Sequence, residues 1–298
     1  MQLPVVSHTY RWLELSPAEF DTSLEQFCRL GVTQLSLSAP QGLQLALHPE
    51  IAEFISHRME STPVAFRDLH APCGMEWDLC CPFPELRVRM LRVQKNLFRC
   101  RSLLGAETVT MHIGNTDSGR PLAELRDWSC RSLEILLPEA EKNHLTLLLE
   151  NTVFPTDTAE ELLNYLRQFK SSALGLCFDT GHANIMSAES GKSSADLIEW
   201  IPRRWPDGVV RFSTNTLSLM LPYIVSCHLH DNNGRADQHK LPGDGTVNWS
   251  LFAERLQHEA PRLRTLQNEA NWVGIHSPRA VVERFQQLFP VGCAEVGS

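Results

Sequence analysis

Strand-like and helix-like segments alternate along almost the whole chain, and this alternation restricts the fold more than any other feature. Eight short apolar runs have the composition of buried strands, namely Pro4 to Ser7, Val32 to Leu37, Pro63 to His70, Thr108 to His112, Leu145 to Glu150, Leu174 to Phe178, Ile224 to His230 and Thr265 to Glu269. Each is followed by a segment with helical apolar spacing, namely Pro17 to Leu30, Pro49 to Met59, Pro84 to Leu104, Leu122 to Lys142, Thr158 to Phe169, Ala195 to Trp200, Trp249 to His258 and Pro278 to Phe289. Eight consecutive βα units predict a closed (β/α)8 TIM barrel of the α/β class.

One domain over residues 1–298 is the expected organisation. No Ser/Gly-rich linker divides the sequence, and no charge run separates an acidic half from a basic half. The stretch from Ile185 to Tyr223 is too long for one helix and a loop, and it contains the turn signal Trp205-Pro206-Asp207-Gly208. A short additional helix is therefore expected before the seventh strand.

Composition predicts a water-soluble cytoplasmic protein. The hydrophobic fraction of 43% and the charged fraction of 21% are those of a globular chain, and no apolar run approaches the roughly 20 residues that span a bilayer. The first residues carry no secretory signal pattern. Nine cysteines without a CxxC pair fit a reducing compartment. A net charge of -8 disfavours nucleic acid and is compatible with small neutral substrates.

Acidic and imidazole side chains stand where six of the predicted strands end. These residues are His70, His112, Glu150, Asp179, His228 and Glu269. In a closed parallel barrel the carboxyl ends of the strands surround one rim, so these side chains are expected to converge there. Any one of the acids alone would be explained equally well as a helix cap.

Four of these residues form a suitable ligand set for one divalent ion. Glu150, Asp179, His228 and Glu269 offer three carboxylates and one imidazole, which suits Mn²⁺, Mg²⁺, Co²⁺ or Zn²⁺. Without a cation, three carboxylates buried together would repel one another. The set therefore predicts a metal site.

The segment from His228 to His239 offers further potential ligands. Asp237 and His239 are two positions apart, so in an extended loop they face the same side and, with His182, are candidates for holding an additional ion. The alternative is that Asn232-Asn233-Gly234 is simply a turn and that Asp237 bonds backbone amides. His230, two residues after His228, is expected to pack against the ligands rather than bind the ion.

The chain resembles the xylose-isomerase-like TIM barrel superfamily, which includes sugar isomerases, ketose epimerases and the apurinic (AP) endonuclease family 2, or endonuclease IV, enzymes. The resemblance lies in Glu150-Asn151, Asp179-Thr180-Gly181-His182, the His228 to His239 segment, and Pro242-Gly243-Asp244-Gly245 leading to Trp249. It covers nearly the whole chain.

The epimerase-like members imply a divalent-metal-dependent isomerase or epimerase of carbohydrate metabolism. By resemblance, Glu150, Asp179, His228 and Glu269 bind the ion, and Glu150 and Glu269 also move the substrate proton through an enediolate. The resemblance makes His182 and Arg235 substrate contacts. Trp77 and Trp272 are candidates for covering the apolar face of a small carbohydrate, unless they only pack at the rim. Relatives commonly form homodimers, although no residue here specifies one.

Endonuclease IV is the alternative relative, and this sequence has a counterpart for each of its three zinc sites. They are His70, His112 and Glu150 for one zinc, Glu150, Asp179, His228 and Glu269 for the second, and His182, Asp237 and His239 for the third. One ion among three carboxylates leaves a charge of about minus one, which suits a neutral sugar, whereas three zincs leave about plus two, which suits a phosphodiester.

The composition of the loops at the strand ends favours a sugar substrate over abasic DNA. Basic residues near the strand ends are few, namely Arg120, Arg235 and Lys240, and the Ala71 to Pro84 loop is acidic and apolar. Abasic DNA is therefore the less favoured substrate. A catalytically silent sugar-binding barrel is a third alternative, against which the two glutamates argue, because binding alone needs no pair of proton carriers.

Overall fold

All eight predicted strands are present and form a closed parallel barrel in the computed structural model of the chain, which describes residues 3–114, 119–188 and 191–290. The strands are β1 (Val6–Thr9), β2 (Gln34–Leu37), β3 (Ala65–His70), β4 (Thr108–Met111), β5 (Thr146–Glu150), β6 (Leu174–Asp179), β7 (Ile224–Leu229) and β8 (Thr265–Asn268). Neighbours in sequence pair in parallel, and β1 pairs with β8 to close the ring. The (β/α)8 TIM barrel prediction is confirmed.

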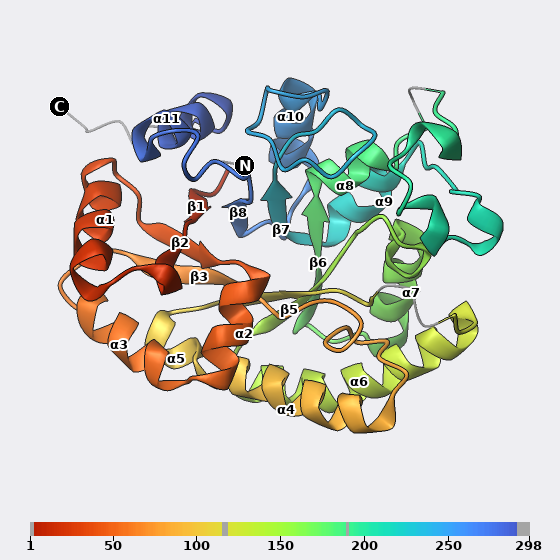
Figure 1. Cartoon of the computed structure of the whole chain (residues 1–298), viewed down its shortest axis with the longest axis horizontal. Helices are drawn as coiled ribbons and strands as arrows, with labels where there is room; N and C mark the ends of the chain where they lie inside the picture. Colours follow the sequence, from red (N-terminus) through yellow and green to blue (C-terminus); the bar gives the residue numbers. More distant parts are fainter. Residues whose placement is uncertain (1–2, 115–118, 189–190, 291–298) are drawn as a thin grey trace.

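Helices surround the barrel, as Figure 1 shows. They are α1 (Pro17–Arg29), α2 (Ala39–Leu47), α3 (Glu50–Met59), α4 (Pro84–Arg99), α5 (Arg101–Leu104), α6 (Leu122–Lys142), α7 (Ala159–Phe169), α8 (Thr180–Ile185), α9 (Thr216–Met220), α10 (Trp249–Glu259) and α11 (Pro278–Leu288). Local chemistry fixes several starts. The Ser16 hydroxyl accepts a hydrogen bond from Glu19 N at 3.4 Å, and the Ser277 hydroxyl accepts one from Ala280 N at 3.2 Å.

The segment between β6 and β7 departs from the prediction. The helix predicted over Ala195 to Trp200 is wrong, because the chain there makes only a 3₁₀ turn over Ser194–Asp196 and then extends at Leu197. Leu197, Ile201 and Trp205 instead bury their side chains in a small separate cluster beside the barrel. The additional helix expected before the seventh strand is present as α9.

Two other helices differ from the sequence expectation. The helix α2 was not predicted, although Ser38 and Gln41 form the reciprocal capping box that marks a helix start. The predicted helix from Pro84 to Leu104 is divided at Cys100 into α4 and α5. Neither difference changes the order of the strands, so the position of the barrel mouth is unaffected.

The inside of the barrel is partly polar. Asp68 on β3 is completely buried and accepts hydrogen bonds from Ser226 Oγ at 2.7 Å and Thr265 Oγ1 at 2.8 Å, as well as from Thr108 Oγ1. Barrel interiors are usually filled by branched apolar side chains. Here one carboxylate joins four strands below the mouth, because Asp68 lies two residues before His70 on the same face of β3.

A buried histidine on β1 is expected to make the fold sensitive to acid. Burial lowers the pKa of His8 from 6.5 to about 3, and its ring packs against Phe27 and Phe285. Below pH 6.5 His8 is therefore protonated in the unfolded chain but not in the folded chain. Its burial does not reduce the free energy of unfolding above pH 6.5, and it reduces that free energy progressively as the pH falls toward 3. The loss at pH 5 is expected to be about 2 kcal/mol.

Thermal unfolding of wild type and His8→Leu at pH 7.5 and pH 5 would measure how much His8 contributes to the loss of stability in acid. Groups at the barrel mouth titrate in both proteins and cancel in the comparison. We expect a smaller pH-dependent drop in melting temperature for the variant. An equal drop in both would show that His8 does not titrate in this range.

None of the described helices combines the length and the apolar character that a membrane span requires.

Candidate metal centre

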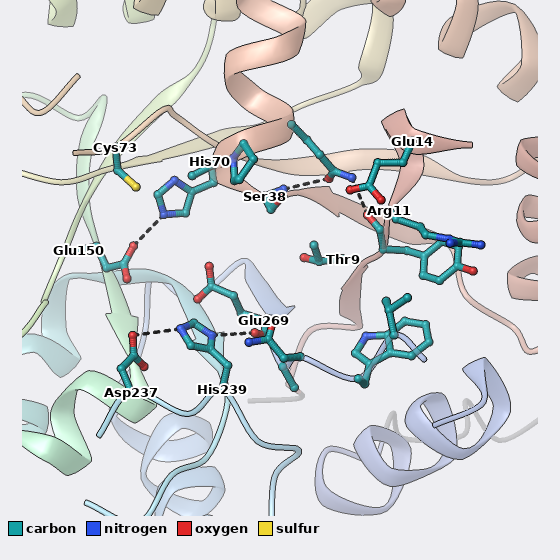
Figure 2. A pocket seen from close by; sticks show the side chains of 18 of the residues that line it. Thr9, Arg11, Glu14, Ser38, His70, Cys73, Glu150, Asp237, His239 and Glu269 are labelled. Atoms are coloured by element: carbon teal, nitrogen blue, oxygen red, sulfur yellow. Dashed lines mark hydrogen bonds and ion pairs between the residues drawn. The ribbon is translucent and has the colours of Figure 1, made fainter. Parts of the chain in front are cut away.

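The six acidic and imidazole residues predicted at the strand ends meet at one end of the barrel. Glu150 and Asp179 are the last residues of β5 and β6, and His70 is the last residue of β3. A cavity of about 790 Å³ opens there, and Figure 2 shows its carboxylates and imidazoles gathered on one side, with Arg11 and Glu14 on the other. Of the predicted ligands, those that line it are His70, His112, Glu150, His182, Asp237, His239 and Glu269.

Glu150 is the centre of this arrangement. Its carboxylate is almost completely buried, and Oε2 lies 3.2 Å from His70 Nε2 and 3.3 Å from His112 Nε2. The same oxygen lies 3.2 Å from His228 Nδ1. One oxygen that faces three imidazoles is suited to bridging neighbouring ion positions.

The four residues predicted to bind one ion are close enough to do so. Glu150, Asp179, His228 and Glu269 each offer a donor atom within 4.8 Å of the others. His228 Nδ1 is fully buried and lies 3.2 Å from a carboxylate oxygen of both Glu150 and Glu269. It nevertheless makes no hydrogen bond of regular geometry with a described residue. A buried nitrogen that faces two carboxylates without bonding to either fits a metal ligand.

Backbone carbonyls orient three of the imidazoles. Ala71 O, Asn151 O and Glu269 O accept from Nδ1 of His70, His182 and His239 at 2.7, 3.1 and 2.9 Å. Since a carbonyl only accepts, each Nδ1 carries a proton, and Nε2 is the nitrogen that faces the carboxylates. Nε2 donates to them while the ring is protonated and would offer its lone pair to a bound ion. Ligating histidines in metal sites are commonly oriented in this way, by the other ring N–H donating to a carbonyl.

A third group of donors comes from the loop after β7. Asp237 Oδ2 lies 3.5 Å from His182 Nε2 and 3.2 Å from His239 Nε2. His239 has a positive φ of 47°, which directs its ring back toward the strand ends. The structure therefore brings together the three residues predicted for an additional ion.

Two of the motifs quoted from the sequence hold this geometry. Asn151 pairs its side-chain amide with both backbone groups of Asp179, at 2.9 and 3.0 Å, and so joins the ends of β5 and β6. The buried Asp231 accepts from Gly243 N, Val247 N and Trp249 Nε1 at 2.9, 3.1 and 2.8 Å. These bonds close the loop that carries Asp237 and His239.

Opposite charges dominate the electrostatics of the site. Burial would raise the pKa of Glu150, but the imidazoles of His228 and His112 hold it well below the usual value. Burial would lower the pKa of His239, but its hydrogen bond to Asp237 raises it to about 9. Protonated imidazoles thus balance the carboxylates, and a bound cation would replace those protons.

The predicted substrate contacts fall into two groups. Trp272 lines the cavity, where its ring stacks on Tyr10 with centroids 5.2 Å apart. His182 lines it as well. Arg235 is exposed outside the cavity lining, and Trp77 packs against the barrel core with Arg89 over its ring at 4.6 Å. The contacts expected of Arg235 and Trp77 with substrate are therefore not supported by this arrangement.

Sequence reasoning missed the other half of the cavity wall. Thr9 ends β1, Tyr10 and Arg11 follow it, and Ser38 follows β2. The strand-end rule that found the candidate ligands from strand three onward also applies to these two strands, but the one histidine there, His8, packs against Phe27 and Phe285, and the side chains that line the cavity are hydroxyl, aromatic and arginine groups. The aromatic and hydroxyl groups there were therefore overlooked.

The chain belongs to the family described as Xylose isomerase-like TIM barrel, which matches residues 4–262. Among curated relatives, the uncharacterized protein MJ1311 of Methanocaldococcus jannaschii is 27% identical over 199 residues, which are 63% of this chain and 59% of MJ1311. The chain thus spans a little over half the length of this relative.

Solved structures with the same fold include sugar epimerases. A D-tagatose 3-epimerase-like protein has a TM-score of 0.69 at 18% identity, with 95% of this chain and 98% of that chain covered. D-psicose 3-epimerase with D-tagatose from Clostridium cellulolyticum H10 gives 0.66 at 15% identity, with 95% and 96% covered. The TTHB071 protein of Thermus thermophilus, soaked with ZnCl₂, gives 0.64 at 21% identity, with 97% and 98% covered.

Proposed function

We propose that this protein is a divalent-metal-dependent isomerase or epimerase of a small sugar or related hydroxy-carbonyl compound. The observation that carries the proposal is the pair Glu150 and Glu269, which lie at the ends of β5 and β8 and each place a carboxylate oxygen 3.2 Å from His228 Nδ1. Two carboxylates beside one candidate ion position are what proton transfer to and from a sugar carbon requires.

Glu150, Asp179, His228 and Glu269 would hold the ion. When bound, it would polarise a substrate carbonyl and so acidify the neighbouring C–H. Glu150 and Glu269 would then remove the proton and return it through an enediolate. His182 and Trp272 would orient the substrate, and Tyr10 would support the Trp272 ring.

The cavity supports a small neutral substrate. Arg11 is the one basic side chain other than histidine on its described lining, and Glu14 offsets its charge. A phosphodiester backbone is usually recognised by several arginines or lysines. The end of the cavity that carries the candidate ligands is polar, and the end formed by Tyr10 and Trp272 is aromatic. Together they suit a sugar, which has both hydroxyl-bearing and apolar faces.

A second candidate function is phosphodiester hydrolysis with up to three zinc ions. The observation that favours it is the nine-residue donor set, because His70, His112, His182, Asp237 and His239 exceed what a single ion needs. The approach of His182 Nε2 and His239 Nε2 to Asp237 Oδ2, at 3.5 and 3.2 Å, is the strongest part of this case.

Solvent isotope exchange would test the proposal directly. We expect the Mn²⁺- or Co²⁺-loaded protein to interconvert ketose epimers in D₂O and to place deuterium at the inverted carbon, which mass spectrometry of the product would detect. Metal content measured on the same sample would give the number of ions per chain. Incision of an abasic duplex by the zinc-loaded protein, with no sugar exchange, would instead establish the second candidate.

A further inference from the structure

His230 lies between the ligand groups without belonging to either of them. It follows β7, two residues after His228, and its side chain is completely buried. The ring contacts both Asp179 and His239, which belong to different candidate ion positions. A buried polar side chain at this junction needs an explanation beyond packing.

The contact with Asp179 is a shared hydrogen bond. His230 Nε2 lies 3.0 Å from Oδ1 and 2.9 Å from Oδ2 of Asp179, so the N–H donates to the carboxylate as a whole. Oδ1 also accepts from the backbone N of His182 at 2.6 Å. These two donors fix the plane of the Asp179 carboxylate and therefore the direction of its remaining lone pairs.

The His230 ring occupies the space that a side chain at position 181 would need. A Cβ at Gly181 would lie 2.0 Å from His230 Cε1, so only glycine fits at that position of the Asp179-Thr180-Gly181-His182 motif. The Thr180 hydroxyl holds the His230 backbone from the other side, accepting from N at 3.1 Å and donating to O at 2.7 Å. Both Thr180 and Gly181 of the motif thus help to place His230.

The contact with His239 is a parallel ring stack. The centroids are 3.8 Å apart and the rings are inclined by only 8°. His230, Asp237 and His239 have donor atoms within 4.8 Å of one another. Stacked imidazoles, however, direct their in-plane lone pairs side by side rather than toward one point, which disfavours one ion shared by the two rings.

We propose that His230 is a positioning residue that fixes the carboxylate of Asp179 for metal binding and supports the ring of His239. The inference rests on the proposed metal-dependent function, because positioning matters only if these residues bind an ion. Outer partners of metal ligands change metal affinity by about 10- to 100-fold when they are removed. An effect of this size is expected for His230.

Cobalt binding tests this role without reference to turnover. Co²⁺ affinity and the visible Co²⁺ spectrum would be measured for wild type, His230→Leu, His230→Gln and Gly181→Ala. The leucine removes the N–H donor, whereas the glutamine offers an N–H near the former Nε2. The Gly181→Ala change displaces the ring while leaving His230 in the chain. His258→Leu removes an exposed histidine in the last turn of α10, outside the cavity lining, and serves as the control.

We expect Co²⁺ affinity to fall about 10- to 100-fold in His230→Leu and Gly181→Ala, with a changed spectrum, and to recover largely in His230→Gln. The control should match wild type. Circular dichroism would establish that each variant is folded, and His230→Gln keeps the test valid if the leucine variant is not.

Two results would overturn the inference. Affinity and spectrum unchanged in His230→Leu would mean that Asp179 needs no such partner. Glutamine as damaging as leucine would mean that the ring itself, rather than its N–H, is required. A wild-type protein that binds Co²⁺ but does not act on sugars would reject the proposed function alone, and one that binds no divalent ion would reject both.

Discussion

Replacing Glu150 by Gln is expected to lower turnover by about 10³- to 10⁴-fold and to weaken metal binding, the largest catalytic effect of any single change in this chain. The carboxylate is buried and faces His70, His112 and His228 through one oxygen. An amide has almost the same shape but neither the charge nor the basicity. Steady-state kinetics, together with metal content, would measure both consequences.

Measuring metal content beside turnover separates the loss of chemistry from the loss of metal, and two further variants give the comparison. Glu269→Gln should also lose most turnover, because it removes the second proton carrier. Glu254→Gln changes an exposed glutamate on α10 and should behave as wild type. If Glu150→Gln kept both its metal and its turnover, Glu150 would be neither a ligand nor a proton carrier, and the proposed mechanism would fail.

The candidate ligands at the strand ends could be predicted from the sequence because two simple rules apply there together. Parallel strands in a closed barrel end at one rim, and an ionisable residue directly after an apolar run is unusual enough to notice. Glu150, Asp179 and His228 satisfy both rules, so their meeting required no knowledge of side-chain packing. Asp237 and His239 were predicted from their spacing in an extended loop, but their approach depends on the left-handed backbone of His239 and on the closure of the loop by Asp231.

The features that the sequence could not place depend on tertiary packing instead. Trp77 was chosen because it lies close in sequence to a strand end, and Arg235 because it resembles a loop arginine of the epimerase-like relatives. Loop conformation brings the Trp77 ring to Arg89 and leaves Arg235 exposed. The helix predicted over Ala195 to Trp200 failed for the same reason. Leu197 and Trp200 have helical spacing, yet their surroundings favour turns that reach a second apolar cluster.

Replacing Asp68 by Ala is expected to be the most destabilising change considered, at about 3 kcal/mol or more. Removing the carboxylate leaves the buried hydroxyls of Ser226 and Thr265 without their acceptor and opens a small cavity inside the barrel. The Thr108 hydroxyl keeps only its long bond to Arg67 O, at 3.4 Å. Unfolding by urea would measure the loss. Metal affinity is expected to fall as well, because Asp68 and Ser226 lie two residues before His70 and His228 on the same strands.

Asp68→Asn provides the graded comparison. One carbonyl oxygen remains as an acceptor, and a serine or threonine hydroxyl can rotate to accept from the new amide, so the cost should be clearly smaller than that of alanine. Asp127→Ala, which breaks an exposed pair with Arg131 on α6, should cost less than about 1 kcal/mol. If Asp68→Ala cost no more than Asp127→Ala, the polar layer beneath the candidate metal centre would contribute nothing to stability, and its three hydroxyl partners would have to be satisfied by water instead.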